Sequence, residues 1–319
     1  MNIKDYEATI RRLVLHAWDN EISWPEISSW MANFTGRYSN AEQEQLYCLF
    51  ALTRFMYFGK RLVREMLRSL YRDHFEAPLM QRIRRNYKGT RDFAFLREKY
   101  NEELRATRFI GVGNPAESGT HLLYYFRQVN QLPKDLFTDI PSAFLPAYDR
   151  RDGVTYYESR QAANRYVFFD DIVGSGTQVI SYLGPHIQRI RAGNKNHELR
   201  FMSLFATTAG LAKVSDPSFF GRGAMSLFEL DESYKAFETT SRYFDKSPVG
   251  FDLATMRGIA QTYGQQLWPD APLGYKDGQL FLAFSHNTPD NVPPIFWDDG
   301  SYFPWAPVFV RYAKIYGGV

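Results

Sequence analysis

Apolar residues in the first hundred positions recur at helical spacing, whereas later ones form short continuous runs. Between about residues 5 and 99 they fall three or four positions apart, as at Leu46, Leu49 and Phe50. That spacing places them on one face of a helix, so we expect three to five helices in this region.

Beyond Arg105, short apolar runs each precede a segment with helical spacing. They lie at 109–113, 166–169 and 201–207. Continuous apolar runs are typical of strands buried on both faces of a parallel sheet, and their alternation with helices predicts crossover connections. The sequence therefore predicts an α/β protein with a parallel sheet. We expect a helical, basic region over 1–104 and an α/β domain over 105–319 that ends in an aromatic C-terminal hood.

Two consecutive carboxylates end the second apolar run. From residue 166 the sequence reads Tyr-Val-Phe-Phe-Asp-Asp-Ile-Val-Gly-Ser-Gly-Thr-Gln. A Gly- and Ser-rich junction that opens a helix offers backbone N–H groups to a phosphate. Asp170 and Asp171 can accept hydrogen bonds from ribose hydroxyls or help to hold Mg²⁺. The pattern predicts a ribose-phosphate site; the alternative is an ordinary capped helix start, because Asp and Ser are common capping residues.

This run resembles the phosphoribosyl-pyrophosphate signature of type I phosphoribosyltransferases. The resemblance implies that Asp170 and Asp171 are the catalytic carboxylates, which lie along the 2′ and 3′ hydroxyls of ribose and hold Mg²⁺ indirectly. The residues that it assigns to the 5′-phosphate are Gly174, Ser175, Gly176, Thr177 and Gln178. Gln178 departs from the residue that many members carry there, so the motif does not fix the substrate. Catalysis in these enzymes rests on positioning and charge neutralisation rather than on a side-chain nucleophile.

A second strand-loop-helix junction reads Arg-Phe-Ile-Gly-Val-Gly-Asn-Pro-Ala-Glu-Ser-Gly from residue 108. By the same resemblance it is the loop that binds pyrophosphate through backbone amides. The residues concerned are Gly113, Asn114, Glu117, Ser118 and Gly119. The alternative is an ordinary glycine-bearing turn.

The acceptor side of the site has weaker signals. Thr207 ends the third apolar run and Thr208 follows it. His286 and Asn287 lie in an aromatic tail where stacking and edge hydrogen bonds could hold a purine or pyrimidine. Thr is common at strand ends, and a lone His is more often structural. The connection 132–165, rich in Pro and Arg, fits either a mobile lid or a surface loop.

Positive charge is concentrated in one segment. Residues 54–108 contain fifteen Lys or Arg and seven Asp or Glu, a net charge of +8, whereas the whole chain carries +3. Such asymmetry favours a polyanionic partner such as nucleic acid, and a solvated helical face is the equal alternative. The single cysteine, Cys48, the acidic N-terminus and the lack of a long apolar stretch predict a cytoplasmic protein with no membrane span.

With the aromatic tail added, the chain resembles phosphoribosyltransferase-like proteins of bacterial conflict systems, including retron effectors, over about residues 25–315. The resemblance implies an antiphage effector toxin that binds phosphoribosyl pyrophosphate or a nucleotide-like ligand. Its implied partners are proteins and the DNA–RNA hybrid of a retron. Glycosyl transfer or N-glycosidic cleavage that arrests growth is the implied chemistry. Alternatives are a metabolic nucleobase phosphoribosyltransferase and a non-catalytic regulator with this fold, and the sequence does not choose among them.

Overall fold

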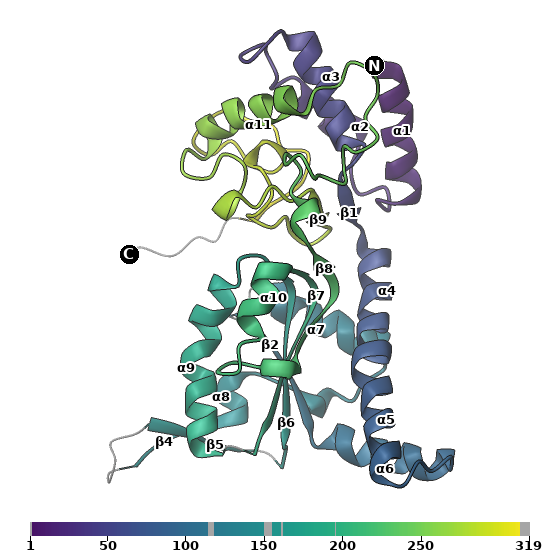
Figure 1. Ribbon diagram of the computed structural model, residues 1–319, viewed down its shortest axis with the longest axis vertical. Helices are drawn as coiled ribbons and strands as arrows, with labels where there is room; N and C mark the ends of the chain where they lie inside the picture. The colour runs from purple at the N-terminus through teal and green to yellow at the C-terminus, as the bar shows by residue number, and fades with distance from the viewer. Residues whose placement is uncertain (1, 114–117, 150–154, 161, 195, 313–319) are drawn as a thin grey trace. The chain divides into compact units, whose positions relative to one another are not determined.

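The structure, a computed structural model, describes residues 2–113, 118–149, 155–160, 162–194 and 196–312 (Figure 1). The chain divides into two compact units. Unit 1 comprises Met1–Val63 and Leu230–Val319, and unit 2 comprises Arg64–Glu229. No helix among the described residues is both long and apolar enough to cross a membrane.

Unit 2 is built on a five-stranded sheet with the order β3-β2-β6-β7-β8. Its strands are β2 (Thr107–Gly111), β3 (Phe137–Thr138), β6 (Arg165–Val173), β7 (Glu198–Thr207) and β8 (Ala224–Leu230). The β2–β3, β2–β6 and β6–β7 pairs are parallel, with Phe109 opposite Val167 and Phe168 opposite Phe201. The predicted α/β fold with a parallel sheet is confirmed.

Helices cover both faces of this sheet. They are α5 (Ala77–Asn86), α6 (Phe93–Arg105), α7 (Ser118–Val129), α8 (Ile140–Ala143), α9 (Thr177–Gly193) and α10 (Thr208–Val214). Tyr166 and Phe168 share a buried cluster with the apolar face of α9. Successive strand residues point to opposite faces, so Phe169 faces the other way and its ring lies 5.2 Å from that of Phe126 on α7. Figure 1 shows α9 on one side of the strands, and α5 and α7 on the other.

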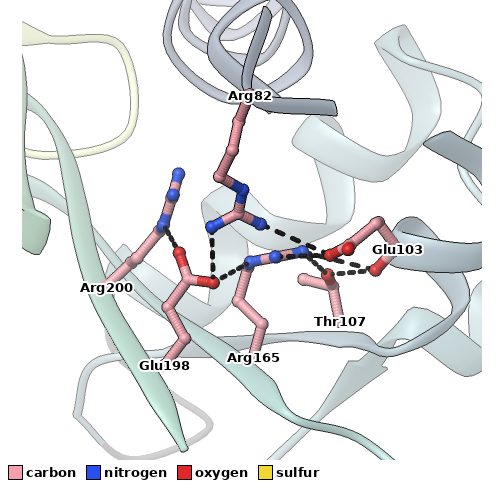
Figure 2. Close-up of polar contacts among 6 residues, drawn as sticks. All are labelled: Arg82, Glu103, Thr107, Arg165, Glu198 and Arg200. Atoms are coloured by element: carbon pink, nitrogen blue, oxygen red, sulfur yellow. Dashed lines mark hydrogen bonds and ion pairs between the residues drawn. The ribbon is translucent and has the colours of Figure 1, made fainter. Parts of the chain in front are cut away.

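An ionic network ties the helices to the N-terminal ends of the central strands (Figure 2). Its members are Arg82 on α5, Glu103 on α6, Thr107 on β2, Arg165 on β6, and Glu198 and Arg200 on β7. The side chain of Arg165 is only 2% exposed and pairs with Glu103 at 2.7 Å and Glu198 at 2.9 Å. Because the buried Arg165 has two carboxylate partners, the cost of removing its charge from water is offset.

The connection 132–165 contains regular structure within its described residues. After β3 and α8 come β4 (Phe144–Tyr148) and β5 (Thr155–Ser159), which pair antiparallel as a separate two-stranded sheet. The hairpin packs close to α9, since a Cβ added at Gly193 would lie 2.0 Å from the carbonyl oxygen of Tyr157.

Unit 1 joins the two ends of the chain. Its regular elements are α1 (Ile3–His16), α2 (Trp24–Met31), α3 (Ala41–Leu52), β1 (Met56–Phe58), the start of α4 (Lys60–Tyr71), α11 (Leu253–Leu267) and β9 (Leu282–Phe284). β1 and β9 pair in parallel, and the indole N–H of buried Trp30 donates to the Ile295 carbonyl at 2.6 Å. The ring of Phe55 stacks on Phe309 at 4.3 Å.

This grouping differs from the boundary expected at residue 104. Helix α4 carries the chain from unit 1 into unit 2, and the π-helical turn η1 (Arg72–Glu76) continues it into α5. Helices α5 and α6 therefore belong with the sheet, whereas the C-terminal segment packs on the N-terminal helices. Apolar spacing identifies the buried face of a helix but not the element that covers it. The sequence therefore did not indicate which helices pack with the sheet and which with the C-terminal segment.

Candidate functional site

The two carboxylates of the motif lie near the carboxyl end of β6. Asp170 is 7% exposed and Asp171 is 5% exposed. The backbone N–H of Asp171 donates to Asp170 Oδ1 at 3.0 Å, and that of Ile172 donates to Asp171 Oδ1 at 2.8 Å. These local hydrogen bonds restrict both side chains at the end of the sheet where open α/β folds bind ligands.

The loop after β6 turns directly into α9. Gly176 has φ of +73°, a left-handed value that favours glycine, and it gives no side-chain hydrogen bond to the first turn of the helix. The Ser175 hydroxyl donates to Thr177 Oγ1 at 3.2 Å. A loop of small residues at the N-terminus of a 17-residue helix can bring backbone N–H groups to an anion.

Helix α10, which follows the neighbouring strand β7, contacts this loop from the other side. The Thr207 hydroxyl donates to the Gly174 carbonyl at 2.6 Å and accepts the Gly210 N–H at 2.9 Å. Lys213 Nζ donates to the Ser175 carbonyl at 2.9 Å. A Cβ at Gly210 would lie 2.2 Å from the Gly174 oxygen, so this close approach requires glycine. The arrangement places a lysine cation at the predicted phosphate loop.

The first junction lies beside the second. The Val112 N–H donates to the Phe169 carbonyl at 2.9 Å, one residue before the Asp pair. Tyr182 on α9 donates its hydroxyl to the Gly113 carbonyl at 2.9 Å. A Cβ at Gly119 would lie 2.7 Å from the Val112 oxygen, so the start of α7 packs directly on these strand ends. Asn114 and Glu117 of the predicted pyrophosphate loop fall outside the described residues, and Ser118 is described only as the first residue of α7.

The candidate acceptor residues belong to two different units. Thr207 caps α10 and donates to the Gly174 carbonyl of the predicted phosphate loop, whereas Thr208 is exposed. Asn287 and His286 belong to unit 1, where Asn287 forms an isolated bridge with Phe284 and the His286 ring stacks on Phe284 at 5.0 Å. Their role in acceptor binding stays a prediction. Gln178 is exposed on the first turn of α9.

Sequence reasoning missed Gly210, Lys213 and Tyr182. Gly210 and Lys213 follow Thr207 at successive intervals of three residues, which puts them on the same side of α10. That spacing was visible in the sequence, but its relation to the loop at 174–176 depends on β7 lying beside β6. Only the fold brings them together.

Comparison with known families decides the assignment. The sequence matches the PRTase-CE family over residues 27–311. The chain belongs to the PRTase-CE family. This confirms the resemblance to phosphoribosyltransferase-like proteins of conflict systems that the two motifs and the aromatic tail together indicated. No curated protein sequence matches the chain.

Solved phosphoribosyltransferases show weak similarity to this PRTase-CE protein. Orotate phosphoribosyltransferase from Aeropyrum pernix is 14% identical, with a TM-score of 0.25, and the match covers 40% of the chain and 63% of that enzyme. Hypoxanthine phosphoribosyltransferase from Trypanosoma cruzi, complexed with the product IMP, is also 14% identical, with a TM-score of 0.25 and coverage of 55% and 75%. The PRTase-CE chain thus spans less than two thirds of the orotate enzyme. Its assignment rests on the family match and on the sheet described above.

Proposed function

We propose that this PRTase-CE protein is the effector of an antiphage defence system, such as a retron toxin. It binds a phosphoribosyl ligand with Mg²⁺ and acts on a nucleotide or a nucleic acid to arrest growth. The observation that carries the proposal is the convergence of Asp170 and Asp171 with two glycine-bearing loops at the carboxyl ends of β2 and β6.

Each part of the site has a distinct role in this proposal. The two carboxylates accept hydrogen bonds from the ribose hydroxyls and stabilise positive charge on the ribose as its glycosidic bond breaks. The backbone at 174–177 binds the 5′-phosphate, and Lys213 adds a positive charge beside it. The junction at 113–119 binds the pyrophosphate.

Asp170 and Asp171 fit an indirect role in holding Mg²⁺. They supply hard carboxylate oxygens, which this ion prefers, and it commonly takes further ligands from substrate phosphates. Among the described residues, no group of three or more His, Cys, Asp or Glu could hold a metal without such help. When bound, Mg²⁺ would neutralise charge on the pyrophosphate.

The proposal is tested by replacing both carboxylates with amides. Asp170→Asn/Asp171→Asn keeps the Oδ1 acceptors for the two backbone N–H groups, so the melting temperature should change by only a few degrees. Growth arrest on expression should be abolished, and calorimetry with phosphoribosyl pyrophosphate and Mg²⁺ should show binding at least about tenfold weaker.

A matched control is available in unit 1. Asp298 and Asp299 are also consecutive, and Asp298→Asn/Asp299→Asn should leave both growth arrest and ligand binding unchanged. Full activity of the Asp170/Asp171 variant would refute the site. Rescue of a purine or pyrimidine auxotroph by the wild-type protein, without growth arrest, would instead favour a metabolic enzyme.

A further inference from the structure

Helix α7 carries a cluster of rings on its solvent side. The rings of His121 and Tyr125 lie 5.0 Å apart at an interplanar angle of 82°, and those of Tyr124 and Tyr125 lie 5.5 Å apart at 72°. Gln128 donates its side-chain amide to the Tyr124 hydroxyl at 2.9 Å. We refer to His121, Tyr124, Tyr125, Arg127 and Gln128, together with Arg64 on α4, as the α7 face.

These rings are presented to solvent rather than packed in the core. Tyr124 is 54% exposed, His121 and Gln128 are also exposed, and Tyr125 is half-buried. The opposite side of α7 supplies Leu122 and Phe126, which are buried against the sheet. The helix therefore does not need the exposed rings for its own packing, and clustered exposed aromatic residues often mark a binding surface.

Positive charge accompanies the rings. The guanidinium of Arg64 lies 5.3 Å from the centre of the Tyr125 ring, and that of Arg127 lies 5.9 Å from the centre of the Tyr124 ring. Within the described chain neither arginine lies within ion-pair distance of a carboxylate. Arg68, one turn beyond Arg64 on α4, pairs instead with Glu65. The α7 face thus combines aromatic planes with arginines whose charge is not neutralised by the described part of the protein.

Helix α4, which carries Arg64, packs against α7. The side-chain amide of Asn130 donates to the Leu67 carbonyl of α4 at 3.3 Å, and the Tyr71 and Phe126 rings lie 5.8 Å apart. These contacts fix α4 alongside α7. The arginine and the rings therefore belong to one surface.

The α7 face begins at the proposed pyrophosphate loop. His121 is two residues after Gly119, which packs on the ends of β2 and β6. From His121 to Gln128 the helix rises about 10 Å away from that loop. A chain of linked nucleotides lying along the face would therefore have one end at the Asp170/Asp171 site.

We infer that the α7 face binds single-stranded nucleic acid and delivers one of its nucleotides to the Asp170/Asp171 site. The delivery step rests on the proposed function, whereas strand binding does not. Aromatic side chains stack on unpaired bases with little regard to sequence, and arginines interact with both phosphates and base planes. A duplex keeps its bases stacked inside and cannot use such rings. The substrate class is accordingly a single strand of RNA or DNA.

The test is fluorescence anisotropy with labelled 20-nucleotide oligo(U) and oligo(dT), and with a duplex of the same length. Wild-type protein should bind at least one single strand more tightly than the duplex. Tyr124→Ser/Arg127→Gln should weaken that binding about tenfold or more, because it removes a stacking plane and a cation. The slope of log affinity against log salt should also become less steep by about 0.7.

A matched control removes the same groups elsewhere in unit 2. Tyr148 on β4 is 61% exposed and Arg222 is exposed, so Tyr148→Ser/Arg222→Gln should leave strand binding unchanged. Equal affinity of the Tyr124/Arg127 variant and wild type would overturn the inference, as would equal binding of duplex and single strands. A variant that changes only the oligomeric state would assign the face to self-association and would also overturn it.

Calorimetry with phosphoribosyl pyrophosphate separates this inference from the proposed function. Tyr124→Ser/Arg127→Gln should retain binding of phosphoribosyl pyrophosphate while losing binding of the strand. If wild-type protein binds no phosphoribosyl pyrophosphate but the variant still loses the strand, the α7 face stands as a nucleic-acid surface and the proposed function fails.

Discussion

Glycine at position 176 lets the chain pass from β6 into α9 with no side chain between the loop and α10. A Cβ there would lie 3.2 Å from the Gly210 carbonyl oxygen and 3.4 Å from Lys213 Cβ. The backbone also has a positive φ, which costs about 1–2 kcal/mol for a residue with a side chain. Space and conformation therefore both restrict this position to glycine.

Replacing this glycine tests the phosphate loop. Gly176→Val should reduce binding of phosphoribosyl pyrophosphate to an undetectable level in calorimetry, because the branched side chain would fill the space that backbone N–H groups need for the 5′-phosphate. Gly221 also has a positive φ, +52°, but a Cβ added there would have no neighbouring atom within 4 Å. Gly221→Val should therefore carry the same backbone strain but still bind phosphoribosyl pyrophosphate. Unaltered binding by Gly176→Val would exclude the loop from the phosphate site.

Candidate site residues that lie close together in the sequence could be predicted from it. Those that meet only because two strands are neighbours in the sheet could not. Asp170, Asp171 and the 174–177 loop form one continuous segment, so strand, turn and helix start could be read together. Lys213 meets the Ser175 carbonyl only because β7 lies beside β6 and leads into α10. The same adjacency brings the Thr207 hydroxyl to the Gly174 carbonyl of the predicted phosphate loop, and its place beside an acceptor stays a prediction.

At the scale of elements, the basic helices are not uniformly available to a polyanion. Arg82 on α5 is half-buried and pairs with Glu103 and Glu198 in the ionic network. Arg84, Arg85 and Lys88, which follow it closely, are exposed. Reversing the charge at Arg82 would disrupt the packing of α5 on the sheet, so its effect on binding could not be separated from unfolding.

Arg84→Glu/Arg85→Glu is therefore the clean test of the basic segment. If α5 binds structured nucleic acid, the affinity for a DNA–RNA hybrid should fall, and the log–log salt slope should become less steep by roughly 2 as two phosphate contacts are lost. Arg11 and Arg12 are adjacent, exposed and on α1, outside this segment. Arg11→Glu/Arg12→Glu should bind as wild type in the same gel-shift series, and equal slopes for all three proteins would leave α5 as a solvated helix.

The sequence predicted individual helices and strands better than it predicted which of them pack together. The strands β2, β6 and β7 stood out because burial on both faces makes their apolar runs continuous. β3 has only two residues, and β4 alternates buried and exposed positions weakly, so neither gave a clear signal. The tail packs on the N-terminal helices through contacts between residues more than 200 positions apart, which no local pattern encodes.

At the scale of the whole molecule, the two units can differ in stability. Each has its own buried core, and unit 2 also contains the ionic network. Burial raises the pKa of Glu198, but Arg165, Arg200 and Arg82 outweigh it and lower that pKa to about 2. The folded state therefore favours the carboxylate, and this contribution is present above about pH 4.5 and lost as the pH falls toward 2.

Differential scanning calorimetry should show separate transitions for the two units. Glu198→Gln should lower one of them by about 5 °C or more at pH 7 and by less at pH 3, since the wild-type carboxylate loses its advantage there. Trp30→Phe removes the buried hydrogen bond to Ile295 in unit 1 and should lower the other transition at both pH values. If both variants lower the same transition equally, the two units unfold as one.

The pairing of β1 with β9 has a consequence for how the protein is made. Unit 2 is complete once the ribosome has added residue 229, but β1 must wait for residues 282–284. Until then the rings of Phe55 and Trp30 lack their partners Phe309 and Phe296. Domains commonly fold in order during synthesis, and exposed aromatic surface attracts chaperones and promotes aggregation. The nascent chain thus carries every residue of the α/β unit while its first helices still lack residues 282–309, against which they pack.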